Sequence, residues 1–442
     1  MDSHSLKEII DSLITAVNGM TNVTVFNFEW RDLPLNKDTR IFLTSARTSF
    51  ASSLRKLVLR AQISKFKELL AITNFDNIDE LDFHFDYRVG DSLPARQREG
   101  NNVNGQRNNP HPVGGPTPIP QHSPNSHSII RDPDAQDLMD TIIPFINYRK
   151  ASLHSLRISS SSSIDLSEFF SALSHFPGLR RFGVQISFDK VSGLSDPSGI
   201  LRLLQSSARS LLHISFAPTW PGQRTGNAYG RMDALTHKRR QWAPINEKLL
   251  AAPATLSSLE SLEIPYFSPS KTIPLIRRSS DTLTSLSLTD HFLTLQEVTE
   301  VVGLFAHRPF EMQHLHIEIM KYGLGLFQML ATRLPNLYSL VVVFSAIPEV
   351  HPDEPVSDTP SFQLKSRFSL MQFFMQFTPP NSALADWKLR DLSVYHERIR
   401  LSGLDDPHRM GVSDLIETDC MRRLTSLVPS IQMLKGLPRN RR

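Results

Sequence analysis

The sequence predicts an α/β solenoid in which one parallel sheet lines a concave wall and helices form the convex wall. Three observations lead to this prediction. A short apolar phrase, Leu-x-x-Leu-x-Leu or a close variant, recurs along the chain. Apolar stripes with helical spacing separate most of its copies. Regular copies start 24 or 25 residues apart, as from Leu54 to Ile78 and from Met312 to Leu337, and a period of this size is typical of stacked repeats.

Each copy of the phrase predicts one strand. Its last two apolar positions alternate with other residues, which is the period of a strand with one buried face. Strand–helix units that repeat in one direction need parallel strands and right-handed crossovers. We therefore expect the eleven strands to share one sheet. The copies start at Val23, Leu54, Ile78, Leu153, Leu179, Leu211, Leu259, Leu283, Met312, Leu337 and Leu389.

The segments between the copies predict helices. Asp165 is a candidate N-cap for one of them, and Pro177, Pro309 and Pro335 lie where a helix must end before the next strand. Helices over 5–18 and 414–427 are expected to cap the two ends, as solenoids require. The apolar stripes with i, i+3, i+4 spacing cover residues 6–17, 66–70, 138–146, 166–173, 295–305 and 324–330.

We expect residues 1–442 to form a single solenoid, because each repeat packs on its neighbours and the core grows along one axis. Three insertions interrupt it. Residues 88–134 are rich in Pro, Asn, Gly and His, and they bury too little apolar surface to offset their ordering entropy, which predicts a disordered loop. Residues 218–244 form a second loop, and residues 346–360 form a solvated acidic loop.

The amino-acid composition limits the kinds of protein that this chain can be. The 48 Lys and Arg residues nearly balance 44 Asp and Glu residues, so a net charge of +4 gives little support for nucleic-acid binding. The single cysteine, Cys420, excludes an internal disulfide framework and fits a reducing compartment. The first residues carry no secretory signal, and no apolar run approaches the roughly 20 residues of a membrane span. We expect a soluble protein of the cytoplasm, the nucleus or both.

The concave face is the candidate binding surface. Its side chains lie between the buried positions of each strand. They are of mixed polarity with small residues in the middle, which suits a protein or peptide partner better than a polyanion. The candidate partner-binding residues are Arg60, Asp82, His84, Asp86, Arg157, Gln185, Glu263, His314, His316, Glu318 and Tyr395.

Catalytic signatures are missing from the sequence. It holds no Gly-rich phosphate loop, no Gly-x-Ser-x-Gly elbow and no His-Glu-x-x-His, so we expect no enzyme and no cofactor. Histidine and carboxylate at i, i+2 on one strand can chelate a divalent ion, which leaves a metal-dependent enzyme using His314, His316 and Glu318 as an alternative. No Cys or second His pair lies near in sequence, so no resident metal is expected.

A nuclear or nucleic-acid-associated factor is a further alternative. This alternative depends on two basic segments, the run Lys238-Arg239-Arg240 and the tail 439–442. One aromatic residue beside the run, Trp242, is too little for a base-stacking platform, so nucleic acid is not the expected partner.

The amino-acid sequence of the repeats resembles that of the leucine-rich-repeat region of fungal F-box proteins. The phrases that carry the resemblance are Ser53-Leu54-Arg55-Lys56-Leu57-Val58-Leu59, Ser258-Leu259-Glu260-Ser261-Leu262-Glu263-Ile264 and Leu334-Pro335-Asn336-Leu337-Tyr338-Ser339-Leu340. The resemblance covers most of the chain outside the insertions, and it implies an irregular leucine-rich-repeat horseshoe. In that family an N-terminal F-box opening with Leu-Pro binds the adaptor of a cullin-type ubiquitin ligase, and the repeats recruit the substrate.

The early sequence leaves two versions of this function open. Asp32-Leu33-Pro34-Leu35 holds the only early Leu-Pro, and residues 36–52 after it are polar with a single apolar stripe, so an F-box is not evident. The chain is then either the substrate-recruiting part of such a ligase or a stand-alone repeat scaffold. Both versions place a protein partner on the concave sheet, and neither involves a membrane.

Overall fold

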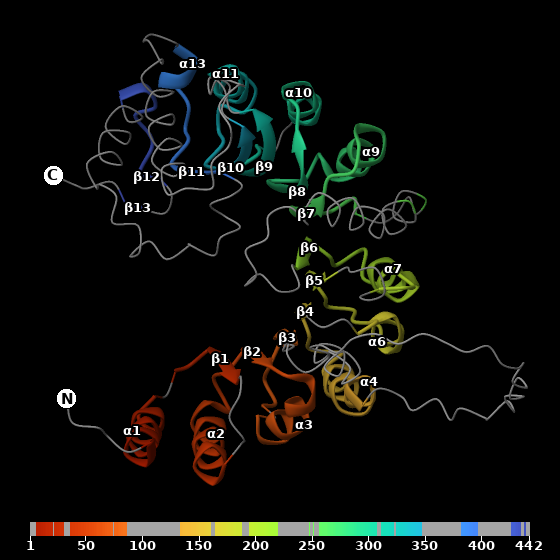
Figure 1. Cartoon of the computed structure of the whole chain (residues 1–442), viewed down its shortest axis with the longest axis vertical. Helices are drawn as coiled ribbons and strands as arrows, with labels where there is room; N and C mark the ends of the chain where they lie inside the picture. Colours follow the sequence, from red (N-terminus) through yellow and green to blue (C-terminus); the bar gives the residue numbers. More distant parts are fainter. Residues whose placement is uncertain are drawn as a thin grey trace, which may run out of the picture.

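In a computed structural model of the chain, the strands line the inner side of an arc and the helices line its outer side (Figure 1). All strands of the described residues belong to one 13-stranded sheet whose order follows the sequence from β1 to β13. The predicted α/β architecture, a repeat-like parallel sheet covered by helices on one face, is confirmed. The structure describes residues 6–20, 22–30, 36–73, 75–85, 133–160, 164–187, 194–219, 247, 251, 256–306, 311–321, 324–346, 382–396, 426–434 and 437–438.

Each of the eleven apolar phrases leads into one of the strands β1 to β11. Neighbours from β1 to β12 pair in parallel, and β13 alone pairs antiparallel, with β12. The strands are β1 (Val25–Trp30), β2 (Lys56–Ala61), β3 (Glu80–Phe85), β4 (Ser155–Ser160), β5 (Arg181–Ser187), β6 (His213–Thr219), β7 (Ser261–Pro265), β8 (Ser285–Leu293), β9 (His314–Lys321), β10 (Ser339–Ala346), β11 (Asp391–His396), β12 (Met433–Leu434) and β13 (Leu437–Pro438).

Helices occupy all six segments with a predicted stripe, and α2, α7, α9 and the short α13 were not predicted. The helix α4 begins within the last two residues of the predicted 88–134 insertion. The rest of that insertion lies outside the described residues. The same is true of most of 218–244, of 346–360 and of the expected 414–427 helix. The helices are α1 (Leu6–Asn18), α2 (Lys37–Phe50), α3 (Ile63–Ile72), α4 (Pro133–Asp137), the π-helical η2 (Leu138–Ile142), α5 (Ile143–Tyr148), α6 (Ser167–Ala172), α7 (Ser198–Ser206), α9 (Pro269–Ser279), α10 (Leu295–Gly303), α11 (Leu324–Arg333) and α13 (Ser382–Ala385).

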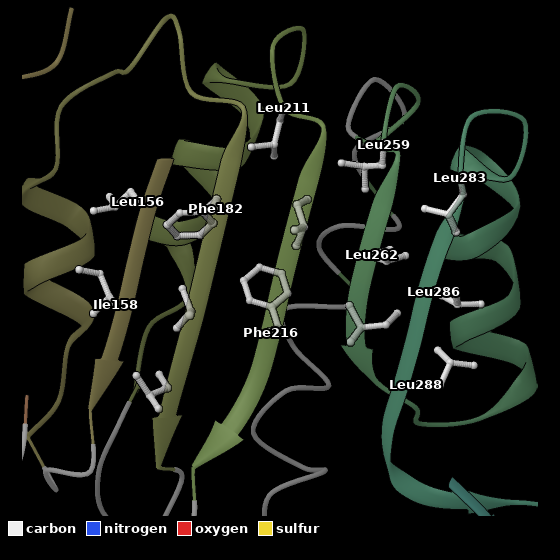
Figure 2. Close-up of a cluster of buried hydrophobic side chains, with 14 of the residues drawn as sticks. Leu156, Ile158, Phe182, Leu211, Phe216, Leu259, Leu262, Leu283, Leu286 and Leu288 are labelled. Atoms are coloured by element: carbon white, nitrogen blue, oxygen red, sulfur yellow. The ribbon is translucent and has the colours of Figure 1, made fainter. Parts of the chain in front are cut away.

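The core is a stack of apolar rows that run across the strands. Equivalent positions of successive phrases are register partners, so Leu156 lies beside Phe182, and Leu262 beside Leu286. These side chains are buried between the sheet and the helices (Figure 2). The first position of the phrase, such as Leu259, is also buried, just before its strand begins. Burying apolar surface at each repeat in the same way holds successive repeats in one register.

One hydrogen-bond pattern recurs at every junction from β1 to β12. The carbonyl just before a strand accepts two backbone N–H groups from the next repeat, at N···O distances of 2.7 to 3.1 Å. Thr24 accepts from Arg55 and Lys56 in this way, and Arg390 accepts from Gln432 and Met433. The last junction shows that Ile431-x-x-Leu434 is a twelfth, incomplete copy of the phrase. Sequence analysis missed it because Gly436 stands at its third apolar position.

A second pattern explains the serine of the Ser-Leu phrases. The hydroxyl just before a copy donates to the carbonyl of the first apolar residue of the previous copy. Ser53 donates to Val23 at 2.9 Å, and Thr282 donates to Leu259 at 2.7 Å. Ser258 and Ser430 make the same bond to Leu211 and Leu389, at 3.4 and 2.7 Å. A small hydroxyl side chain at this position therefore links the turn of one repeat to the turn of the next.

Candidate protein-binding surface on the concave sheet

The concave face is formed by the strand side chains that do not enter the core. In β2 and β3, buried and partly exposed residues alternate along the whole strand. Leu57, for example, is buried against the helices, while Lys56 and Val58 are partly exposed on the opposite face. The described helices lie on the outer side of the arc and do not cover this face (Figure 1).

The structure brings five of the predicted site residues together. Asp82 and His84 lie on β3, Arg157 lies on β4 and Gln185 lies on β5, so three adjacent strands carry them. Arg60 is the register partner of His84 on β2. These five side chains occupy one part of the concave face.

The other predicted residues lie further along the sheet. Glu263 is on β7, and His314, His316 and Glu318 are on β9. Tyr395 belongs to β11 as the register partner of Val343, although its side chain is outside the described part. Asp86 also lies outside the described residues.

Cross-strand pairs organise the charges on β2 to β5. The Glu80 carboxylate lies 3.7 Å from Lys56 Nζ and 3.2 Å from Arg181 Nη1. Arg181 is two strands away, so its side chain passes over the small residue between them, Ser155. Partial burial and the positive charge of Arg181 lower the pKa of the neighbouring His213, against the opposing effect of Glu260. These charged residues were not among the candidates, although strand alternation places them on the same face.

Arg157 turns away from the carboxylate beside it. Asp82 is its register partner, but the Asp82 Oδ1 atom lies 3.0 Å from His84 Nε2 instead. The Arg157 side chain lies over Gly183 on β5, and its guanidinium donates to Gln185 Oε1 on the same strand at 3.1 Å. A Cβ atom at Gly183 would lie 3.1 Å from Arg157 Cγ, so the glycine leaves room for the arginine.

The C-terminal half of the face has a different chemistry. Glu263 accepts a hydrogen bond from Ser215, and His316 Nδ1 lies 2.9 Å from Ser287 Oγ. Glu318 is only 9% exposed, so it offers less surface to a partner than its place in the strand predicts. The register shifts between β8 and β9 next to it, after Leu288. Strand alternation alone does not reveal such an irregularity.

The alternative function, a metal-dependent enzyme using His314, His316 and Glu318, needs a set of metal ligands. Within the described residues, no group of three or more His, Cys, Asp or Glu side chains could hold a metal ion. The His314 ring lies edge-on to Tyr338, with centroids 5.9 Å apart, and His316 contacts Ser287. His314 is exposed, whereas His316 is partly buried.

Three further ionisable groups with shifted pKa values lie away from the concave polar residues. Burial lowers the pKa of Arg149 to about 10, against the nearby charge of Asp76, and its guanidinium donates to Phe75 O at 3.0 Å. Partial burial raises the pKa of Asp165, but hydrogen bonds from Ser167 and Ser195 outweigh it and hold that pKa below its usual value. Burial and nearby carboxylates raise the pKa of Tyr266, which stacks on His291. Each group joins neighbouring repeats or loops, which is a structural role.

Comparison with protein-family models and with curated proteins finds no match to this chain. In the described part of the chain, no helix combines the length and the apolar character needed to cross a membrane. The functional assignment therefore depends on the geometry and chemistry of the concave sheet.

Proposed function

We propose that this chain is a non-catalytic leucine-rich-repeat scaffold that binds a protein partner on its concave sheet. The observation that carries the proposal is the concave face itself. It is a row of in-register strand positions that presents polar side chains of both signs, and none of the described helices lies over it. Repeat proteins use extended concave surfaces of this kind for binding.

The arrangement of charges favours a protein over a polyanion. Lys56, Arg157 and Arg181 alternate with Glu80 and Asp82 on neighbouring strands. A nucleic-acid surface needs a continuous run of cations to neutralise phosphates. Interleaved charges of both signs instead give the complementarity that sets specificity and register between proteins.

The resemblance to fungal F-box proteins supplies a context for this binding. In that context the scaffold recruits a substrate for ubiquitylation, and a cullin-ligase adaptor is a second partner. The alternative is a stand-alone scaffold that binds its partner without the ligase. Capture of the adaptor by the purified full chain, in a defined stoichiometry, would support the ligase context, whereas capture of other proteins alone would support the stand-alone scaffold.

A blocked concave face tests the proposal directly. Ala217 lies on β6 beside Gln185, partly exposed in the middle of the concave face. We expect Ala217→Trp to lower the recovery of the chain's partners from cell extract about tenfold, since a large ring would hold the partner away from the sheet; tenfold corresponds to about 1.4 kcal/mol. Recovery is measured by quantitative mass spectrometry on the immobilised full chain.

The matched control is Ala71→Trp, which places the same ring on an exposed position of α3 on the convex side. It should leave recovery unchanged. Equal recovery with both variants, or equal loss with both, would contradict binding on the concave sheet. Thermal unfolding of each variant shows that the fold is retained.

A further inference from the structure

We infer that the concave face at β3–β5 contains a position that binds the carboxylate of an aspartate or glutamate side chain from a protein partner. The inference depends on the proposed function and names the chemistry that the partner must present. The position is formed by Arg157, Ser159 and Gln185, called here the donor cluster. His84 lies next to it, as the register partner of Ser159.

Ser159 provides the first observation. It lies on β4 between its register partners His84 and Gln185, on the strand positions that form the concave face. It is 5% exposed, and its Oγ atom has no hydrogen-bond partner among the described residues. Buried polar groups are nearly always hydrogen-bonded, and one left unpaired costs free energy. The Oγ atom is shielded from solvent, so a ligand atom reaches it when a covering side chain shifts, and a bond to that atom would remove the cost.

Arg157 and Gln185 provide the second observation. The single bond between them uses the acceptor oxygen of the amide, since the guanidinium donates to Gln185 Oε1 at 3.1 Å. The amide nitrogen of Gln185 and the remaining guanidinium N–H groups are all donors. Together with the Ser159 hydroxyl, they offer several hydrogens to one acceptor. A carboxylate accepts such bonds in pairs, and charge-assisted bonds to arginine are the stronger kind.

The surrounding charge supports a single anionic group. On β2 to β5 the concave positions carry the cations Lys56, Arg60, Arg157 and Arg181 against Glu80 and Asp82, four charges against two. Glu80 lies within ion-pair distance of both Lys56 and Arg181. Arg157, by contrast, donates to the neutral amide of Gln185, so its charge is the one available to an anionic group at this position. The two acids beside it would repel a longer acidic run, so the position suits one carboxylate.

The test uses a random linear peptide library displayed on phage and selected on the immobilised full chain. We expect the enriched peptides to share one acidic position. Each enriched peptide is then made with a fluorescent label in two forms, with the acid and with its amide (Glu→Gln or Asp→Asn), and its Kd is measured by fluorescence anisotropy. The amide form should bind about tenfold more weakly.

The protein side of the test uses Arg157→Gln. This variant should raise the Kd of the acidic peptide to that of the amide peptide, while it leaves the Kd of the amide peptide nearly unchanged. Such coupling shows that the two groups interact. Arg277→Gln, which removes an exposed cation from the convex helix α9, is the matched control and should bind both peptides as the original chain does.

Ser159→Ala separates a ligand-binding role from a structural one. The variant should raise the Kd of the acidic peptide several-fold. Its midpoint of thermal unfolding should stay the same or rise, because the substitution removes a buried hydroxyl that has no partner in the described fold. A fall in the midpoint would show that the hydroxyl stabilises the free protein, and it would overturn its assignment to the donor cluster.

The remaining outcomes also decide the matter. Enriched peptides without a shared acid, no enrichment at all, or equal weakening of both peptide forms by Arg157→Gln would overturn the carboxylate position. Suppose that the enriched peptides share no acid, or that Arg157→Gln weakens both peptide forms equally. If Ala217→Trp still abolishes their binding, binding on the concave sheet stands while this inference fails. If a phosphoserine in place of the acid binds more tightly and still depends on Arg157, the ligand is a phosphopeptide and the assignment to an acidic side chain is wrong.

Discussion

At the scale of single residues, the hydroxyl before each apolar phrase is the clearest link between sequence and structure. Ser53, Ser258, Thr282 and Ser430 each donate to the carbonyl that begins the previous copy. The side chain thus satisfies a turn carbonyl that backbone donors leave with a free lone pair. The serine of the Ser-Leu phrases is in this way a structural residue of the repeat.

We expect Thr282→Val to lower the free energy of unfolding by about 1 kcal/mol. The shape of the side chain is kept while the 2.7 Å bond to Leu259 O is lost. Chemical denaturation measures the change. Thr299→Val is the control, because Thr299 makes only a local bond to Leu295 O on an exposed face of α10, and it should change the stability by less than about 0.5 kcal/mol. Equal effects would show that the link between repeats contributes nothing of its own.

The sequence could predict which residues face the concave side, but not how they pair. Alternation places Asp82, His84, Arg157 and Gln185 on that face, and the structure agrees. It does not reveal that Arg157 leaves Asp82 for Gln185, because that choice depends on the missing side chain of Gly183 in the next repeat. The burial of Glu318 depends likewise on its packing environment, beside a register shift between β8 and β9.

At the scale of elements, packing decides which segments become helices. The unpredicted α2 has a polar sequence, yet it buries Thr39, Leu43, Ala46 and Phe50 along one face. The unpredicted α9 contains Pro269 and Pro274 and still forms, with Leu275 and Ile276 buried. Tertiary packing outweighs intrinsic propensity in both cases, which is why the sequence alone did not reveal them.

The approach of α6 to α7 depends on one glycine. A Cβ atom at Gly199 would lie 2.5 Å from Ser171 N and 2.6 Å from Phe170 C, both backbone atoms. We expect Gly199→Ala to lower the free energy of unfolding by about 1–3 kcal/mol, as overpacking does. Differential scanning calorimetry and denaturant titration measure the loss.

Gly325→Ala is the matched control for this prediction. Gly325 lies near the start of α11, and its nearest neighbour to an added Cβ is a flexible Leu295 side-chain atom at 3.9 Å. Alanine should be neutral there or stabilise the helix by up to about 1 kcal/mol. If Gly199→Ala behaves like Gly325→Ala, close packing between α6 and α7 is not a constraint.

At the scale of the whole molecule, stability is a sum over neighbouring repeats. Strand order follows the sequence even across the longest gaps, so β3 and β4 are register partners although residues 86–132 lie between their described parts. The predicted insertion therefore adds chain between two repeats without changing which repeats are neighbours. Each interface should be unaffected by its length.

We expect deletion of residues 97–125 to leave the midpoint of thermal unfolding within about 2 °C of the original, because stability here depends on neighbouring repeats and not on the insertion. Leu286→Ala is the positive control, since this fully packed leucine should cost about 2–5 kcal/mol. A large fall in the midpoint after the deletion would show that the insertion packs on the repeats and belongs to the fold.

The two ends of the sheet differ in a way that gives the solenoid a direction. At the C-terminal end the antiparallel β13 pairs with β12, and its Pro438 has no N–H to offer a further strand. At the N-terminal end, within the described residues, β1 has a strand on one side only. Within the described residues, the edge at β1 is a strand that a further parallel repeat could join in register, whereas the edge at β13 is a two-residue antiparallel strand with a proline. For anyone who wishes to lengthen this protein by design, the β1 edge is therefore the preferred place to add a repeat.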